Sequence, residues 1–353
     1  MTRSETLLRH FDEQAAGCEH FGSPFTAALI GAMRGDLEAG GPVAALVGDW
    51  PGSPRPDAVS LRLTGALHFA ALSKMDPALA EVYPGGAKYS REPAWPRARD
   101  FLAREHDFVA GFVKSPPQTN ETRRAIALLP GFLAAARRFG LPLQTFEIGA
   151  SAGLNLNWDS FAYKTQSWSY GAGSVVIDTD WRGPAPDLSA PLRVAARAAC
   201  DLNPLDIREP LARLRLKSYI WADQAERLAR FDAAVALALA KDVRVERESA
   251  EVGLRRVLAD RLPGTTAVVY HSIFYQYPPP PVRQAIAAAI ADAGSRASAS
   301  APLAWLRFEP EALLGGPRDS MRFLVDLTTW PGGETRILAL SDPHGRWVEN
   351  TAA

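Results

Sequence analysis

The sequence predicts an α/β protein, with an all-helical N-terminal domain over residues 1–116 and a doubly wound, mostly parallel sheet over residues 117–353 that closes in a β-hairpin. Three observations carry this prediction. Strand-like and helix-like segments alternate after Lys114-Ser-Pro-Pro-Gln, no strand alternation precedes that point, and a turn of small residues directly follows the first strand.

Bulk composition is that of an ordinary globular protein. The 353 residues are 47% apolar and 22% charged, and 39 basic side chains balance 39 acidic ones. This balance argues against nucleic acid as a partner. Two cysteines are too few for a disulfide framework or a cysteine-based metal site, and we expect no metal. The charged N-terminus and the lack of a long apolar run predict a cytoplasmic protein without a membrane partner.

The elements follow in order. In the first half, apolar residues recur at helical spacing, for example Phe25, Leu29 and Met33. A helix before Gly140-Leu-Pro leads into the first strand at 144–148, and a second helix is expected from Leu154 onward. The later predicted elements are strands at 243–246, 266–271 and 303–308, a helix at 282–290, and a hairpin of 321–327 with 335–340 around Pro331-Gly-Gly. A Trp-rich insertion near 158–191 interrupts this rhythm and is interpreted as an inserted hairpin.

The most informative segment is Phe146-Glu-Ile-Gly-Ala-Ser-Ala-Gly-Leu-Asn-Leu156. Small residues at Gly149, Ser151 and Gly153 allow a ligand to approach the backbone, and a helix start there favours a negative or polar group. Glu147, near the end of the strand, can accept hydrogen bonds from an amino group or from hydroxyls.

This segment resembles the first motif of class I S-adenosylmethionine-dependent methyltransferases, an acid followed by glycines at alternate positions, with Ser151 in place of the middle glycine. Cys200-Asp-Leu-Asn-Pro204 is similar to their second motif, which implies that Asp201 binds the ribose hydroxyls. The spacing departs from the usual one of about 20 residues. Asp178 has the more usual spacing, and the choice between the two acids stays open.

The same resemblance implies S-adenosylmethionine as cofactor and a small molecule as methyl acceptor. It places Glu248 near the adenine, and Gln118 and Asn120 near the ligand carboxylate, although plain capping of the following helix is the favoured interpretation of these two. His271, at the end of the predicted fourth strand, is a candidate general base, and Tyr275 is a candidate to frame the substrate. The alternative for His271 is a buried histidine, hydrogen-bonded for packing.

Several stretches together resemble a bacterial family designated domain of unknown function 2332, a resemblance that implies no activity. They are Pro117-Gln-Thr-Asn-Glu, Gly149-Ala-Ser-Ala-Gly-Leu-Asn-Leu, Cys200-Asp-Leu-Asn-Pro-Leu-Asp and Trp305-Leu-Arg-Phe-Glu-Pro.

Two other functions fit the turn. Gly149-x-Ser151-x-Gly153 also matches the nucleophile elbow of α/β-hydrolases, which would make Ser151 a nucleophile, His344 its base and Asp319 or Asp326 the acid. No His-Gly-Gly run precedes it to complete an oxyanion hole, and Glu147 would be buried in the strand that feeds the elbow. A nucleotide-binding protein without catalysis is the third possibility. We expect a methyltransferase, and the sequence leaves its acceptor and its oligomeric state open.

Overall fold

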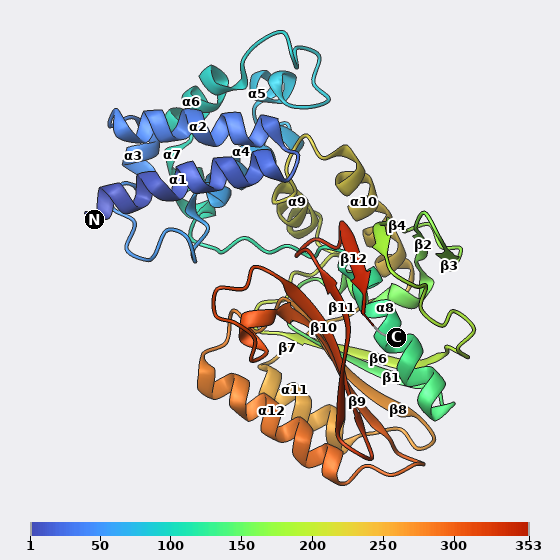
Figure 1. Cartoon of the computed structure of the whole chain (residues 1–353). Coiled ribbons are helices and arrows are strands. Elements are labelled where there is room, and N and C mark those ends of the chain that lie inside the picture. Colours follow the sequence, from blue (N-terminus) through green and yellow to red (C-terminus); the bar gives the residue numbers. More distant parts are fainter. Residues whose placement is uncertain (1, 352–353) are drawn as a thin grey trace. The chain divides into compact units, whose positions relative to one another are not determined.

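The computed structural model describes residues 2–351, which form two compact units (Figure 1). The first unit comprises Met1–Thr119 and Ile207–Phe231, and the second comprises Asn120–Asp206 and Asp232–Ala353. The sequence predicted a continuous helical domain over 1–116. The compact unit extends to Thr119 and also takes in residues 207–231, so it is built from two separate stretches of chain.

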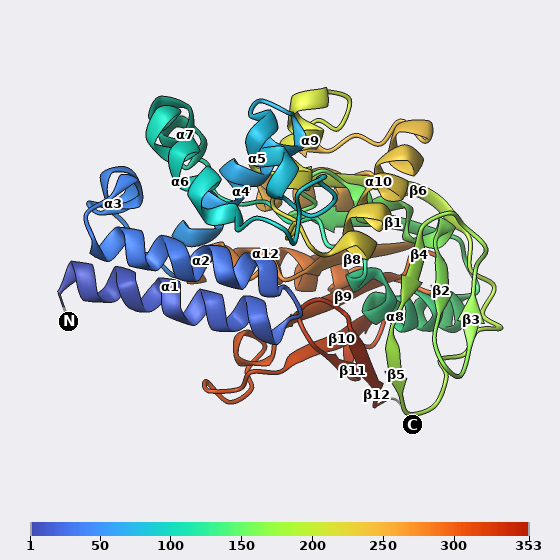
Figure 2. The same cartoon turned by 90° about the horizontal axis from the view of Figure 1, so that it is seen from above.

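Among the described residues of the first unit, all regular secondary structure is helical. Thr2 and Glu5 form a capping box that starts its first helix, and α1 and α2 lie side by side in both views (Figures 1 and 2). Its helices are α1 (Arg3–His20), α2 (Pro24–Glu38), α3 (Pro42–Val47), α4 (Val59–Leu72), α5 (Pro77–Val82), α6 (Ala94–Arg104), α7 (His106–Phe112), α9 (Pro210–Ser218) and the first part of α10 (Ala225–Ala240). Among residues 2–351, no helix is both long and apolar enough to cross a lipid bilayer.

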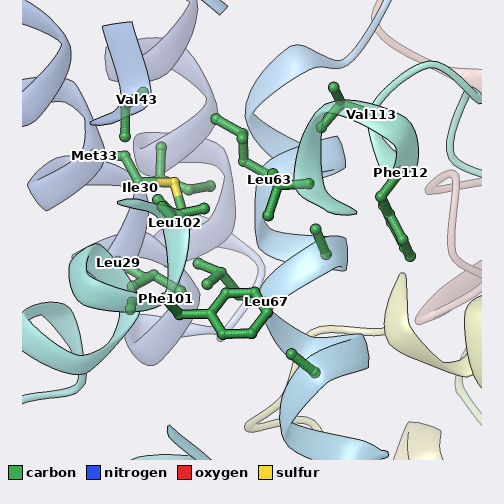
Figure 3. Close-up of a cluster of buried hydrophobic side chains, with 14 of the residues drawn as sticks. Leu29, Ile30, Met33, Val43, Leu63, Leu67, Phe101, Leu102, Phe112 and Val113 are labelled. Atoms are coloured by element: carbon green, nitrogen blue, oxygen red, sulfur yellow. The ribbon is translucent and has the colours of Figure 1, made fainter. Parts of the chain in front are cut away.

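The core of the first unit is formed where α2, α3, α4 and α6 meet. Figure 3 shows Leu29, Ile30 and Met33 of α2 facing side chains from the other helices, among them Val43, Leu63, Leu67, Phe101 and Leu102. Tyr219 and Ala222 from the second stretch of chain belong to the same buried cluster. The segment 207–231 is therefore part of the core of this unit.

The second unit is built on a nine-stranded sheet in the order β5-β12-β11-β10-β9-β8-β1-β6-β7. Five neighbouring strands, β7, β6, β1, β8 and β9, are all parallel, and the other four strands extend the sheet beyond β9. The strands are β1 (Leu143–Ile148), β5 (Asp180–Arg182), β6 (Val194–Asp201), β7 (Glu246–Arg247), β8 (Thr266–Ser272), β9 (Leu303–Pro310), β10 (Phe323–Trp330), β11 (Glu334–Ser341) and β12 (Trp347–Asn350). The prediction of an α/β protein with a mostly parallel sheet and a closing hairpin is confirmed by this order.

Helices cover both faces of this sheet. α8 (Arg124–Phe139) packs on one face, where Leu306 of β9 contacts Gly131, whereas α11 (Ala250–Ala259) and α12 (Pro280–Ser295) pack on the other (Figure 1). Numbered by their order in the chain, the five parallel strands lie across the sheet as third, second, first, fourth and fifth. The order therefore reverses between β1 and β8, and in doubly wound sheets ligands bind outside the carboxyl ends of the strands at that point.

The structure corrects the prediction of a helix after the glycine turn. Leu154 begins a seven-residue 3-10 helix, η1 (Leu154–Ser160), instead of an α-helix, and Asn157 within it has non-helical angles. Asn157 and Asp159 both accept hydrogen bonds from the guanidinium of Arg197, at 3.4 and 2.9 Å. Short polar side chains that bond elsewhere disfavour a regular helix, and a helix this short has no strong dipole to attract an anion.

The insertion is more than the expected hairpin. It forms a three-stranded sheet in the order β3-β2-β4, and β5 pairs in parallel with β12 at the edge of the large sheet. Its strands are β2 (Ala162–Lys164), β3 (Ser169–Tyr170) and β4 (Val176–Asp178). The strand predicted at 243–246 is shorter and begins three residues later, since β7 includes only Glu246 and Arg247.

Candidate functional site

The turn after β1 is bound to the end of β6. The backbone N–H of Ser151 donates to Oδ2 of Asp201 at 2.8 Å, and the amides of Gly149 and Ala150 donate to the carbonyl oxygen of Cys200 at 2.9 and 3.1 Å. Oδ1 of Asp201 also accepts the N–H of Asn203 at 2.8 Å. The two segments that resembled methyltransferase motifs thus meet at the carboxyl ends of β1 and β6.

The turn requires residues that tolerate a left-handed backbone. Gly149, Ser151 and Gly153 have φ angles of 68°, 55° and 74°. A Cβ on Gly149 would lie 2.4 Å from the ring of Phe274, and one on Gly153 would lie 2.8 Å from Val243 and from Val245. Phe274, Val243 and Val245 therefore explain why glycine is required at both positions, because they fill the space in which a Cβ atom would lie.

Glu147 is an acid buried next to this turn, with a residue exposure of 3%. Its Oε2 accepts a hydrogen bond from the hydroxyl of Tyr270 at 3.2 Å. Burial, chiefly, raises the pKa of Glu147 to about 8; the nearby Asp201 also raises it, while Tyr270 and Arg124 act in the opposite direction. At neutral pH the folded protein therefore holds this carboxyl mostly protonated.

The remaining polar candidates around the turn are spread over several positions. Asn120 accepts the N–H of Leu154 with its Oδ1 at 2.8 Å, so it holds the start of η1. Glu248 is ion-paired with Arg256, and its own N–H donates to the carbonyl oxygen of Asp201 at 3.2 Å. Gln118 belongs to the first unit, whose first stretch of chain ends at Thr119.

Of the two competing acids, Asp201 is the one that contacts the turn. Asp178 ends β4 in the small sheet, where its carboxylate pairs with Arg123 at 3.2 Å. The sequence favoured Asp178 only through its spacing from Gly153. That spacing is not informative here, because the inserted residues form a separate small sheet.

His271 lies on the opposite face of the sheet from Glu147, because it follows Tyr270 in β8 and successive side chains of a strand alternate between the two faces. It is completely buried, its Nδ1 lies 2.6 Å from Oε1 of Glu309, and its Nε2 accepts a hydrogen bond from Nε1 of Trp305 at 3.2 Å. Because the indole only donates, the imidazole proton lies on Nδ1 and is directed at Glu309. Tyr275 stacks on the imidazole at 4.7 Å between centroids. A general base must reach its substrate, and here both ring nitrogens are engaged within the core.

The sequence did not predict the hydrogen bonds from the segment after β8 to Glu309, which we call the Glu309 clamp. The buried carboxylate of Glu309 accepts the backbone N–H groups of Phe274 at 2.8 Å and of Tyr275 at 3.2 Å, in addition to its contact with His271. Ile273 has a φ of 53°, which is unusual for a β-branched residue. This clamp fixes the ring of Phe274 against Gly149. The available signal was an acid directly after the strand predicted at 303–308, in Leu306-Arg-Phe-Glu-Pro310.

These features define an α/β protein whose strand-order reversal, glycine turn and acids Glu147 and Asp201 lie at the carboxyl edge of one sheet. The chain belongs to the bacterial family described as "Uncharacterized protein conserved in bacteria (DUF2332)", whose model matches residues 9–350. No curated protein matches the chain, and no solved structure does.

Proposed function

We propose that the second unit binds S-adenosylmethionine at the carboxyl edge of β1 and β6 and transfers its methyl group to a small molecule. The observation that supports this most is the hydrogen bond from Ser151 N–H to Asp201, which joins the glycine turn to the acid beside the strand-order reversal. Each oxygen of Asp201 accepts one backbone hydrogen bond and keeps a further lone pair, so the carboxylate can still accept two ribose hydroxyls.

Glu147 fits the positively charged end of this ligand. A buried carboxyl bonded to one tyrosine hydroxyl is costly to ionise, and a cation placed beside it would offset that cost. Bound S-adenosylmethionine supplies the activated methyl group, and the chain's own contribution is to position the two reactants. Because Phe274, Val243 and Val245 fill the space against the glycines, the ligand would contact the turn through Ser151 and the two acids.

The direct test is calorimetric titration of the full chain with S-adenosylmethionine and S-adenosylhomocysteine. We expect saturable heat and a higher Tm, since a ligand at 100 times its Kd stabilises by about 2.7 kcal/mol. The binding enthalpy at pH 7 should also depend on the buffer, because Glu147 would release its proton next to a cation. No heat and no Tm shift at millimolar ligand would contradict the proposal. Binding without any methyl transfer would instead support the nucleotide-binding alternative.

One observation favours a second candidate, a serine hydrolase. Ser151 has a positive φ in a tight turn that follows a strand, as the nucleophile of an elbow does. Against it, His271 directs its two nitrogens to Glu309 and Trp305, and Asp326, one of the two acids considered for a triad, accepts a hydrogen bond from Arg307 at 2.8 Å. We therefore rank the hydrolase second.

A further inference from the structure

The amides of the glycine turn are already used within the protein. Between Gly149 and Leu154, five backbone N–H groups donate to protein acceptors. Gly149 and Ala150 donate to the carbonyl oxygen of Cys200 at 2.9 and 3.1 Å, Ser151 to Oδ2 of Asp201 at 2.8 Å, Gly153 to the carbonyl oxygen of Ala150 at 2.8 Å, and Leu154 to Oδ1 of Asn120 at 2.8 Å. Turns that bind phosphate offer such N–H groups to its oxygens. A phosphate bound here would have to displace these acceptors, each of which would lose its hydrogen bond.

The charges beside the turn also disfavour an anion. The carboxylate of Asp201 holds the turn, so a phosphate group there would lie next to a negative charge. Glu147 supplies a second carboxyl group, and burial together with the charge of Asp201 raises the pKa of that group. Arg124 opposes this pKa shift, but its guanidinium donates to the carbonyl oxygens of Pro343 at 2.9 Å and Ser272 at 3.4 Å.

The space against the two glycines is also closed to a phosphate. In dinucleotide-binding turns, a glycine lets the backbone approach the pyrophosphate. Here the ring of Phe274 lies where a Cβ atom of Gly149 would be, and two valine side chains fill the same space at Gly153. The element that follows, η1, is a seven-residue 3-10 helix, whereas phosphate is attracted to the N-terminus of a regular α-helix.

We infer that the ligand of this turn is a nucleoside without a phosphate group, held mainly by hydrogen bonds that the ligand donates. This inference rests on the proposed binding of S-adenosylmethionine and extends it, because the same residues would reject nucleotides such as AMP. Asp201 and Glu147 present oxygen acceptors, which match ribose hydroxyls and a neutral or cationic substituent on the ribose. A non-catalytic protein with this turn would likewise bind nucleosides in preference to nucleotides.

The test is calorimetric titration of the full chain with adenosine, AMP, 5′-methylthioadenosine and S-adenosylhomocysteine. Adenosine and AMP differ only in one phosphate group, and we expect AMP to bind at least about tenfold more weakly. Methylthioadenosine has a neutral group in place of the phosphate and should bind at least as tightly as adenosine. Asp201→Asn removes the charge and keeps an oxygen for the Ser151 N–H, so it should reduce the preference for adenosine over AMP. Asp178→Asn is the control and should leave this preference unchanged, because Asp178 pairs with Arg123 in the small sheet.

The four compounds separate this inference from the methyltransferase proposal. AMP that binds as tightly as adenosine would overturn the inference, even if S-adenosylhomocysteine also binds. Binding of adenosine and methylthioadenosine without S-adenosylhomocysteine would contradict the methyltransferase proposal and leave the preference for nucleosides standing. No binding of any of the four compounds at millimolar concentration would overturn both. An unchanged preference in Asp201→Asn would refute the part assigned to the charge of Asp201.

Discussion

Oδ2 of Asp201 lies 2.8 Å from the backbone nitrogen of Ser151, so the carboxylate at the end of the second parallel strand holds the turn that follows the first. The hydrogen bond is charge-assisted and connects residues 50 positions apart. Asp201 is therefore both a structural part of the turn and the acid best placed to bind a ligand there.

These two roles of Asp201 can be separated by substitution. Asp201→Ala is expected to weaken S-adenosylhomocysteine binding at least about tenfold, which corresponds to 1.4 kcal/mol. Asp201→Asn retains an oxygen for the Ser151 N–H and should keep the stability, but it should still bind more weakly because the charge is lost. Asp178→Ala is the control and should leave the affinity measured by calorimetry unchanged. Full affinity in both Asp201 variants would remove this residue from the site.

Glu147→Gln is expected to stabilise the protein at high pH only. In the folded state the pKa of Glu147 is about 8, against 4.5 for the free group, so between these values the unfolded chain is ionised and the folded chain is not. The free energy of unfolding should therefore fall by about 1.4 kcal/mol per pH unit from pH 4.5 towards 8, and glutamine removes this slope. Urea unfolding at pH 5 and pH 8 measures it. The exposed Glu246→Gln should show no such difference, and a stabilising effect of Glu147→Gln equal at both pH values would contradict the assignment.

Ser151→Ala distinguishes the two enzyme classes. Because the Ser151 N–H bond to Asp201 remains, we expect a loss of at most about 0.5–1.5 kcal/mol in stability or ligand affinity. The wild type should not react with a fluorophosphonate, as read by gel fluorescence or intact mass. Strong labelling of the wild type that disappears in the alanine variant would reverse our ranking in favour of the hydrolase.

The helical unit is expected to lose stability in mild acid. Burial lowers the pKa of His10 and of His68 to about 4, below the 6.5 of a free histidine. Above pH 6.5 both states are neutral, but between pH 6.5 and 4 only the unfolded chain takes up protons. Stability should therefore fall by about 1.4 kcal/mol per pH unit for each histidine as the pH drops through this range. His10→Asn and His68→Asn should each flatten the slope seen in denaturant unfolding, and the exposed His20→Asn should not.

Glu309→Gln should loosen the segment after β8. An amide can replace one oxygen of the carboxylate but not both, so the N–H groups of Phe274 and Tyr275 lose part of their charged acceptor. We expect a loss of about 1.5–3 kcal/mol and faster hydrogen exchange at these two amides. Glu311→Gln is the matched control, because it also removes a paired carboxylate, but one that bonds Arg322 instead of the amides of Phe274 and Tyr275, so exchange at these two amides should not change. Unchanged exchange in Glu309→Gln would mean that the clamp does not hold this segment.

A feature of this protein could be predicted from the sequence where residues close together in the chain determine it, but not where it depends on residues far apart in the chain. The glycine turn and the strand before it, predicted at 144–148, could be predicted because neighbouring residues determine a short strand and the turn that follows it. The 3-10 geometry of η1 was not, since it depends on Arg197, about 40 residues away. The enclosure of His271 likewise depends on Trp305 and Glu309, 34 and 38 residues later.

The helical unit is built from two separate stretches of chain, so its folding cannot be completed until both have been synthesised. Tyr219 and Ala222 complete a core whose other members precede residue 119, so this core stays unfinished while 103 further residues (222 − 119) are translated. At about 5–20 residues per second, that delay lasts roughly 5–21 seconds. The strands β1 and β6 leave the ribosome within this interval, before the first unit can close. The nascent chain thus exposes two incomplete apolar surfaces at once, a state in which chaperone binding would protect it from aggregation.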